Sequence, residues 1–186
     1  FFPAGPDTIT TFYRRSVVIS GLVINRDASL KYSSNIFDGT LLYQLYLVAN
    51  ILTEMNGVFS PKVLALYRNG GIPDFGNSET EKEKYVPNNQ TPESSIHFMR
   101  GMLEIIKWTE KKRNIQIVKR VTIDIGNYCY PILSIQAKQP INIFIKYTYQ
   151  FAKLGFWKNK MFYLYFLSLI VLGGDRVDKV IQFIKH

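Results

Sequence analysis

The sequence predicts an α/β fold with few strands, followed by a mostly α-helical C-terminal region. The β-branched stretch Val17–Asn25 and the short apolar stretch Lys62–Tyr67 indicate strands, and helical spacing of apolar residues dominates after residue 91. The composition changes at the same point, so we expect two parts, residues 1–90 and residues 91–186.

The first part is expected to begin with a short helix at residues 7–15. Val17–Asn25 then reads as a strand with Gly21 in its interior, bounded by polar residues. A glycine inside an apolar strand indicates that either a neighbouring element or a ligand approaches its backbone, and packing is the simpler explanation.

The most clearly periodic helix of the first part is predicted at Thr40–Met55, where apolar residues recur at spacings of three and four. Asp38 or Thr40 can cap its start, and Asn56-Gly57 can end it. Lys62–Tyr67 is expected to be a second strand. Residues 68–90 are polar and rich in Gly and Pro, which predicts a long loop of the kind that is functional or disordered.

The second part is expected to be helical throughout. Thr91-Pro92 is a typical helix start, with Thr as cap and Pro in the first turn, and this helix should run to about Arg113. Residues 115–137 are interpreted as one kinked helix, because Gly126 and Pro131 interrupt an apolar pattern. Three further helices are expected at Pro140–Leu154, Asn159–Leu172 and Asp175–Lys185.

The positive charge belongs to the second half of the chain. Residues 1–93 carry eight basic and nine acidic side chains, whereas residues 94–186 carry 15 basic and five acidic ones. The fifty residues between Asp124 and Asp175 contain no acid but hold twelve aromatic side chains and five lysines: Lys138, Lys146, Lys153, Lys158 and Lys160. Such a block is suited to an anionic partner that also has an apolar layer.

Several kinds of site are excluded by composition. The single Cys129 cannot form a disulfide within the chain, and it fits a reducing compartment. The two histidines, His97 and His186, do not have zinc-ligand spacing, and phosphate-binding glycine loops and the GxSxG elbow are absent. A catalytic centre would therefore have to use carboxylates, backbone amides and arginine.

Three segments contain the candidate site residues. Asp38, just before the predicted helix, is either a helix cap or a general base aimed into a cleft. Arg68, Gly70 and Gly71 follow the second predicted strand, and they form either an ordinary exposed loop or a turn that binds phosphate. Ser20, Gly21 and Arg26 are candidates because of the glycine inside the first predicted strand.

In this order, the three segments resemble part of a known family. Ile19–Arg26 resembles the strand and turn that follow the metal-binding part of bacterial family 2 glycosyltransferases with a GT-A fold. Phe37–Gln44 resembles the segment with the catalytic carboxylate, and Leu66–Gly71 resembles the stretch that leads into a mobile loop over the sugar nucleotide. The basic, aromatic tail is similar to tails of members that build O-antigen or capsule, and the abequosyltransferase-like group is the most similar.

The resemblance implies an inverting transfer of a sugar from a nucleotide-sugar donor to a lipid-linked or polysaccharide acceptor. Asp38 would be the catalytic base, and substrate would be bound by Ser20, Gly21, Arg26, Arg68, Gly70 and Gly71. A divalent cation, Mg²⁺ or Mn²⁺, is implied as cofactor, but the family's Asp-x-Asp motif does not occur in the 186 residues. We therefore expect a piece of a longer enzyme, inactive without its nucleotide-binding half, and assign no metal ligand to it.

Two other classes of function compete with this interpretation. The lysines and aromatic residues of the tail suit the inner, cytoplasmic face of an anionic cell membrane, where the chain could act as a membrane-surface or protein-interaction module without catalysis. The aromatic residues could equally form a core. Nucleic-acid binding is disfavoured, because Phe162–Leu172 is apolar apart from Ser168 and contains no arginine.

Overall fold

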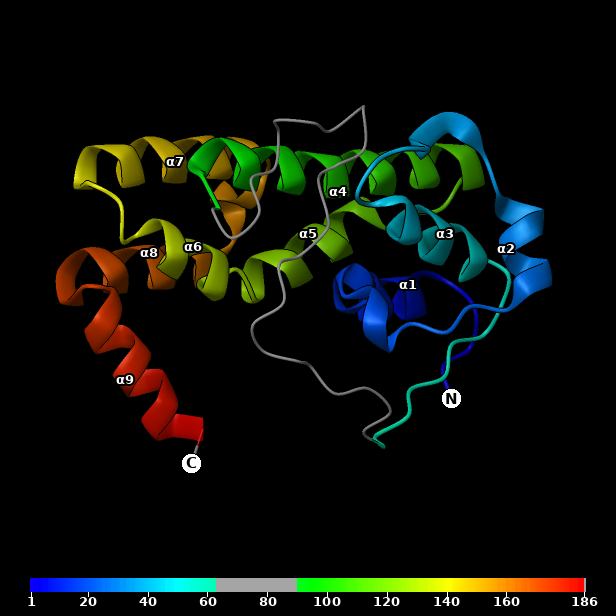
Figure 1. The fold of residues 1–186 in the computed structure, drawn as a ribbon, viewed down its shortest axis with the longest axis horizontal. Helices are drawn as coiled ribbons and strands as arrows, with labels where there is room; N and C mark the ends of the chain where they lie inside the picture. The colour runs from blue at the N-terminus through cyan, green and yellow to red at the C-terminus, as the bar shows by residue number, and fades with distance from the viewer. Residues whose placement is uncertain (63–89, 186) are drawn as a thin grey trace.

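The computed structural model describes residues 1–62 and 90–185, and these residues form helices and connecting turns (Figure 1). The α-helices are α1 Pro6–Tyr13, α2 Arg26–Tyr32, α3 Tyr43–Ile51, α4 Pro92–Arg113, α5 Val118–Asn127, α6 Tyr130–Gln136, α7 Ile141–Lys153, α8 Lys160–Leu172 and α9 Gly174–Lys185. Short 3₁₀ turns are η1 Arg14–Val17, η2 Ile19–Gly21, η3 Asn35–Phe37 and η4 Phe156–Lys158. Within the described residues, extended pairing is limited to one antiparallel bridge, between Phe2 and Gly57.

The predicted α/β class is therefore wrong for the described part of the chain. Val17–Asn25 forms the end of η1, the η2 turn and a short irregular segment instead of a strand. Val18, Ile19 and Val23 are 66%, 62% and 91% exposed. β-Branched side chains favour a strand only where a neighbouring strand and a buried face receive them, and no such neighbour lies among the described residues. Most of the second predicted strand, Lys62–Tyr67, falls outside them.

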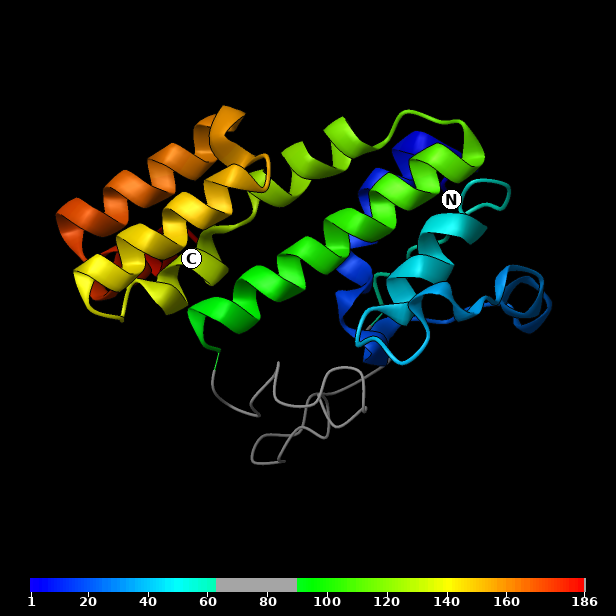
Figure 2. The same ribbon diagram turned by 90° about the horizontal axis from the view of Figure 1, so that it is seen from above.

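Helix α4 connects the two ends of the molecule, as Figure 2 shows in the view from above. Its start is as predicted: the Thr91 side chain accepts a hydrogen bond from the Ser94 amide at 3.1 Å, and Pro92 occupies the first turn. It ends at Arg113, also as predicted, where Asn114 takes a left-handed conformation at φ 52°. The helix packs against α3 from the first part and against α5 and α7 from the second.

Two hydrogen bonds in the core tie α4 to both ends. The Tyr13 hydroxyl at the end of α1 donates to the Met102 carbonyl at 2.7 Å. On the other side, Ser95 and the α7 residue Tyr147 share a hydrogen bond of 2.9 Å. Contacts thus cross the predicted boundary near residue 91, although the division into two parts itself stays a prediction.

The predicted kinked helix at residues 115–137 is two helices, α5 and α6, which are separated at Tyr128 and Cys129. The start of α5 lacks a side-chain cap of its own. Instead, the Glu110 carboxylate of α4 accepts hydrogen bonds from the amides of Ile117 and Val118, both at 2.7 Å. These two donors would otherwise lack partners at the helix N-terminus.

The C-terminal helices pack through a cluster of aromatic rings. Phe151 of α7 stacks on Phe156 of η4 at 4.4 Å between ring centroids and on Phe162 of α8 at 5.8 Å. Gly155, at φ 119°, allows the turn between them. The interpretation of these aromatics as core is confirmed for this set, whose members are Phe144, Tyr147, Phe151, Phe156 and Phe162.

Helix α9 points away from the rest of the molecule (Figure 1). Its buried Val177 faces the body, and its Asp178 accepts a hydrogen bond from the Tyr130 hydroxyl at 2.5 Å. Further along the helix, Val180 and Phe183 are 51% and 85% exposed.

Candidate functional site

The predicted catalytic residue, Asp38, lies on an exposed loop between η3 and α3. Its Oδ1 accepts a hydrogen bond from the Gly39 amide at 2.9 Å, and Gly39 takes a positive φ of 72°. The alternative prediction, that Asp38 or Thr40 caps the next helix, is wrong: α3 begins at Tyr43 without a side-chain cap. Asp38 is thus an accessible carboxylate that is not engaged in starting a helix.

Aromatic packing holds this loop against the body. The Phe37 ring lies 5.5 Å from Tyr46 of α3 and 6.1 Å from Trp108 of α4, measured between centroids. The Thr40 hydroxyl closes the turn by donating to the Phe37 carbonyl at 2.7 Å. The residue before Asp38 is therefore anchored while Asp38 itself faces solvent.

The first group of predicted substrate-binding residues lies on η2 and at the start of α2. Ser20, Gly21 and Arg26 are exposed, and no hydrogen bond or ion pair in the described part of the chain joins them to Asp38. The space around Gly21 is open: a Cβ added there would meet no described atom within 4 Å. The prediction that something packs closely on its backbone is therefore not met within the described residues.

The second predicted group, Arg68, Gly70 and Gly71, lies outside the described residues. Its role near a diphosphate or acceptor stays a prediction. For the implied divalent cation, residues 1–62 and 90–185 contain no group of three or more His, Cys, Asp or Glu side chains that could hold a metal ion. The divalent cation therefore stays an expectation from the resemblance.

A second candidate region is the solvent-facing side of α7, η4 and α8, which we call the C-terminal face. Along α7 the exposed residues Ile141, Ile145 and Tyr149 follow one another every four positions, so they lie on one side of the helix. The opposite side of α7 is buried. Along α8 most of the exposed apolar residues also lie on one side, and these are Tyr163, Leu164, Leu167, Ile170 and Val171.

Lysines border this face. Lys146 and Lys153 of α7, Lys158 of η4 and Lys160 of α8 are all exposed. Since the surrounding fifty residues contain no acid, the face is positively charged as well as apolar. Exposed apolar patches with a polar rim mark protein or membrane contact sites.

A hollow of about 270 Å³ lies where α7 and α8 meet η4 on the C-terminal face. Three rings line it, those of Tyr149, Trp157 and Tyr163, together with Ala152 and Lys153. The Lys153 ammonium lies 4.5 Å from the Tyr149 ring centroid, and the Lys158 ammonium lies 4.7 Å from that of Trp157.

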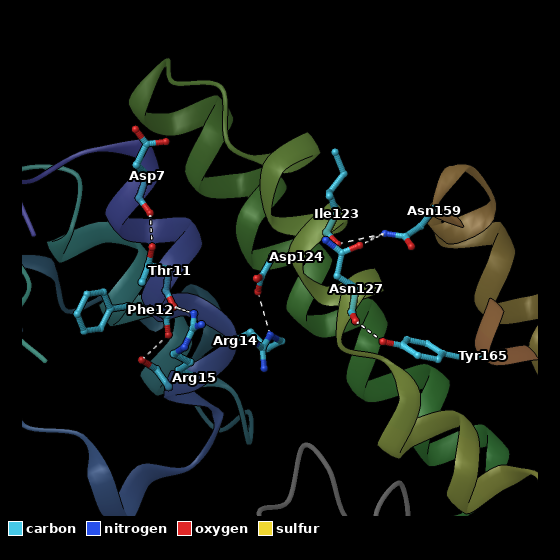
Figure 3. A network of polar contacts seen from close by, with 11 residues as sticks. Asp7, Thr11, Phe12, Arg14, Arg15, Ile123, Asp124, Asn127, Asn159 and Tyr165 are labelled. Carbon is cyan, nitrogen blue, oxygen red and sulfur yellow. Dashed lines mark hydrogen bonds and ion pairs between the residues drawn. The ribbon is translucent and has the colours of Figure 1, made fainter. Parts of the chain in front are cut away.

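A polar network fixes α8, and with it the C-terminal face, against α5 (Figure 3). Asn159 caps α8 by accepting from the Phe162 amide at 3.1 Å, and its Nδ2 donates to the Ile123 carbonyl at 3.2 Å and to Asn127 Oδ1 at 3.1 Å. The Tyr165 hydroxyl donates to the Asn127 carbonyl at 2.9 Å. The sequence analysis did not find this network, and the helix-start position of Asn159 is the one signal that could have indicated it.

The other side of α5 is joined to the first part of the chain (Figure 3). Asp124 forms an ion pair of 2.9 Å with Arg14, drawn in Figure 3. The Arg14 guanidinium also lies 3.9 Å from the centroid of the Tyr128 ring. Helix α5 is therefore held from both sides, which makes it a fixed support for α8.

Three buried or partly buried titratable groups in this region have raised pKa values, which suits a structural role better than proton transfer. Burial raises the pKa of the Cys129 thiol to about 12. The pKa of Tyr130 is raised to about 12, first by desolvation and then by its hydrogen bond to Asp178. Burial likewise raises the pKa of Tyr147. All three stay protonated at neutral pH.

Comparison of the chain with protein-family models, with curated proteins and with solved structures finds no match. Among the helices of residues 1–62 and 90–185, none combines the length and apolar character that crossing a bilayer requires.

Proposed function

We propose that this chain takes part in the transfer of a sugar from a nucleotide-sugar to a lipid-linked or polysaccharide acceptor, with Asp38 as the base. The observation that supports this role is the exposure of Asp38 on a loop anchored by Phe37, within the segment that resembles the carboxylate-bearing part of family 2 glycosyltransferases. The proposal does not depend on a GT-A sheet in the described residues.

In the proposed step, Asp38 accepts the proton of the acceptor hydroxyl. The hydroxyl oxygen forms a bond to the anomeric carbon of the donor sugar while the bond from that carbon to the nucleoside diphosphate breaks, which inverts the configuration. Such a base has to lie within about 3 Å of the hydroxyl. Ser20, Gly21, Arg26, Arg68, Gly70 and Gly71 remain the proposed substrate-binding residues.

The test is sugar transfer by the full natural protein, measured with a panel of radiolabelled nucleotide-sugars and a membrane lipid fraction as acceptor. Asp38→Asn is expected to abolish transfer and to leave donor binding intact. Asp27→Asn, which alters another exposed acid on the neighbouring helix α2, is the matched control and should leave transfer unchanged. Turnover near the wild-type rate in Asp38→Asn would contradict the proposal.

A second proposed function, binding of the C-terminal face to an anionic membrane surface, has an observation of its own. Apolar residues are exposed along one side of α7 and of α8, and lysines border them. Each basic residue near such a surface contributes about 1 kcal/mol, and apolar side chains add to this when they enter the interface. Membrane binding would also bring a lipid-linked acceptor to the enzyme, at the inner face of the cell membrane.

Co-sedimentation with vesicles tests the second function. The wild-type chain should sediment with vesicles that contain phosphatidylglycerol and stay in the supernatant with phosphatidylcholine alone. Leu164→Glu/Leu167→Glu, at two exposed positions of α8, should abolish sedimentation, whereas Val23→Glu, at a position that is 91% exposed outside the face, should not. Equal sedimentation of both variants would overturn this proposal.

A further inference from the structure

The hollow on the C-terminal face has a chemistry more specific than that of the face around it. It is lined by rings from three successive elements: Tyr149 from α7, Trp157 from η4 and Tyr163 from α8. Tyr149, Trp157 and Tyr163 are 60%, 55% and 45% exposed, so the rings are only partly covered and can be reached from outside. Tyr and Trp are the side chains that settle at the level of lipid headgroups, because they join an apolar ring to a polar tip.

The charge around the hollow selects the sign of its ligand. Lys153 lines the hollow, and Lys158 lies over the ring of Trp157. Acidic residues are absent from positions 125–174, so within this stretch no carboxylate is available to neutralise these two ammonium groups. An ammonium over a ring keeps its charge and can still donate hydrogen bonds to an anion.

The hollow is shallow and open to solvent, so a ligand can enter it from outside. Its volume of about 270 Å³ is just below the range of about 300–1,000 Å³ in which drug-sized ligands bind, and it suits a headgroup with its phosphate. None of its lining residues is among those proposed to bind the sugar donor, so it is proposed as a separate site.

We propose that this hollow binds the phosphate headgroup of a single anionic phospholipid. Lys153 and Lys158 hold the phosphate, and the three rings contact the glycerol and the first acyl carbons. This inference rests on the proposed membrane binding of the C-terminal face and refines it, since it replaces a diffuse attraction by a defined subsite.

The probe is dihexanoylphosphatidylglycerol, used as a monomer below its micelle concentration, so that the assay needs no membrane. The chain has two tryptophans, and Trp108→Phe leaves Trp157, beside the hollow, as the single tryptophan, which can be excited selectively at about 295 nm or above. In that background the lipid should shift the Trp157 emission in a saturable manner. Glycerol 3-phosphate, which lacks the acyl carbons, should bind at least about tenfold more weakly, because several buried methylene groups are lost.

Matched double variants separate the subsite from general attraction. Lys153→Ala/Lys158→Ala removes two charges at the hollow, and it should weaken binding of the monomeric lipid at least about tenfold, the effect of losing one charge-assisted hydrogen bond. Lys119→Ala/Lys138→Ala removes two exposed charges outside the C-terminal face and should change it less than about twofold, the residual effect of screened surface charges. Circular dichroism checks that both variants are folded.

The outcomes distinguish the phospholipid subsite from the membrane binding of the C-terminal face. Equal weakening by the two double variants, or glycerol 3-phosphate binding as tightly as the lipid, would overturn the subsite even if the wild type still sediments with anionic vesicles. Saturable binding of the monomer that only the Lys153/Lys158 pair disturbs would support it. Failure of the wild type to sediment with anionic vesicles would instead remove the membrane function on which it rests.

Discussion

At the scale of single residues, the sequence analysis was most successful where a local rule acts alone. Thr91 and Pro92 begin a helix because their backbone preferences and hydrogen bonds are satisfied within four residues. Asp38 was open to two interpretations, a helix cap or a base. The cap is wrong, because α3 starts only at Tyr43, and the preceding residue Phe37 instead packs on Trp108, which is distant in the sequence. Asn159 could be recognised as a helix start, but its contacts with α5 could not, because they depend on how two helices pack.

Gly126 gives the sharpest prediction at this scale. Alanine normally stabilises a helix relative to glycine by about 1 kcal/mol. A Cβ at position 126, however, would lie 2.5 Å from Asn159 Nδ2, inside the network that caps α8. Gly126→Ala should therefore lower the free energy of unfolding, as measured by urea denaturation. A stabilised variant would mean that Asn159 can move away without cost.

Cys129 predicts how stability depends on alkaline pH. The pKa of this thiol is raised to about 12 by burial, while in the unfolded chain it is about 8.5. Above that value the unfolded state releases a proton that the folded state keeps, so the stability present at lower pH is lost as the pH rises toward the folded pKa. The loss approaches about 1.4 kcal/mol per pH unit.

Between about pH 8 and 9, each tyrosine of the unfolded chain is still about nine-tenths or more protonated, so the thiol should dominate the slope. Urea denaturation over this interval should show a steeper decrease for the wild type than for Cys129→Ala. Labelling by a thiol reagent at pH 8 should follow the unfolded fraction. Fast labelling of the folded chain would contradict the burial.

At the scale of elements, the helices after residue 91 were predicted well and the first strand, Val17–Asn25, was not. Amphipathic helices satisfy their own backbone hydrogen bonds, so their spacing of apolar residues predicts them in isolation. A strand needs a partner, and the β-branched Val17–Asn25 has none among the described residues. Gly126 and Pro131 led to the prediction of a kink, whereas the chain forms two separate helices, α5 and α6. The start of α5 at Val118 depends on Glu110, whose carboxylate accepts from amides seven and eight residues away.

Glu110→Ala should destabilise the fold by about 1–2 kcal/mol, because two amides at the start of α5 lose their acceptor. Glu104→Ala, which removes an exposed glutamate from the same helix α4, is the control and should change stability by less than about 0.5 kcal/mol. Thermal melting followed by circular dichroism measures both. Equal melting temperatures for the two variants would show that water replaces Glu110.

At the scale of the whole molecule, the charge and apolar patterns of the sequence predicted that the C-terminal helices carry a basic and aromatic surface. They did not predict the hollow on this surface or the contacts that hold α8 against α5. Exposed and buried aromatic residues occur on the same helices. Which of them are buried becomes clear only from the packing of Phe151 against Phe156 and Phe162. Ser20, Gly21 and Arg26 were grouped with Asp38 because the segments that contain them follow one another in the same order as in one family. Order along a chain does not fix proximity, and the described contacts do not bring them together.

Because α4 is hydrogen-bonded both to α1 and to α7, we expect the described helices to unfold in one transition. Phe151→Ala should cost about 3–5 kcal/mol, since the ring is fully buried. In a Trp157→Phe background, the fluorescence of Trp108 reports on its packing with Phe37 and Tyr46, far from Phe151. In Phe151→Ala, the unfolding transition seen by this fluorescence should shift together with the transition seen by circular dichroism. Gln150→Ala, at an exposed position of α7, is the control. A Trp108 transition that stays in place would show that the two ends unfold independently.

The exposed apolar sides of α7 and α8 also have a consequence for the chain when no lipid is present. At low ionic strength, repulsion among Lys146, Lys153, Lys158 and Lys160 keeps copies of the chain apart. Added salt shortens the range of this repulsion from about 30 Å at 0.01 M to about 10 Å at 0.1 M but leaves the apolar attraction intact. Raising the salt concentration should therefore promote clustering of the purified chain, while the same change releases it from vesicles.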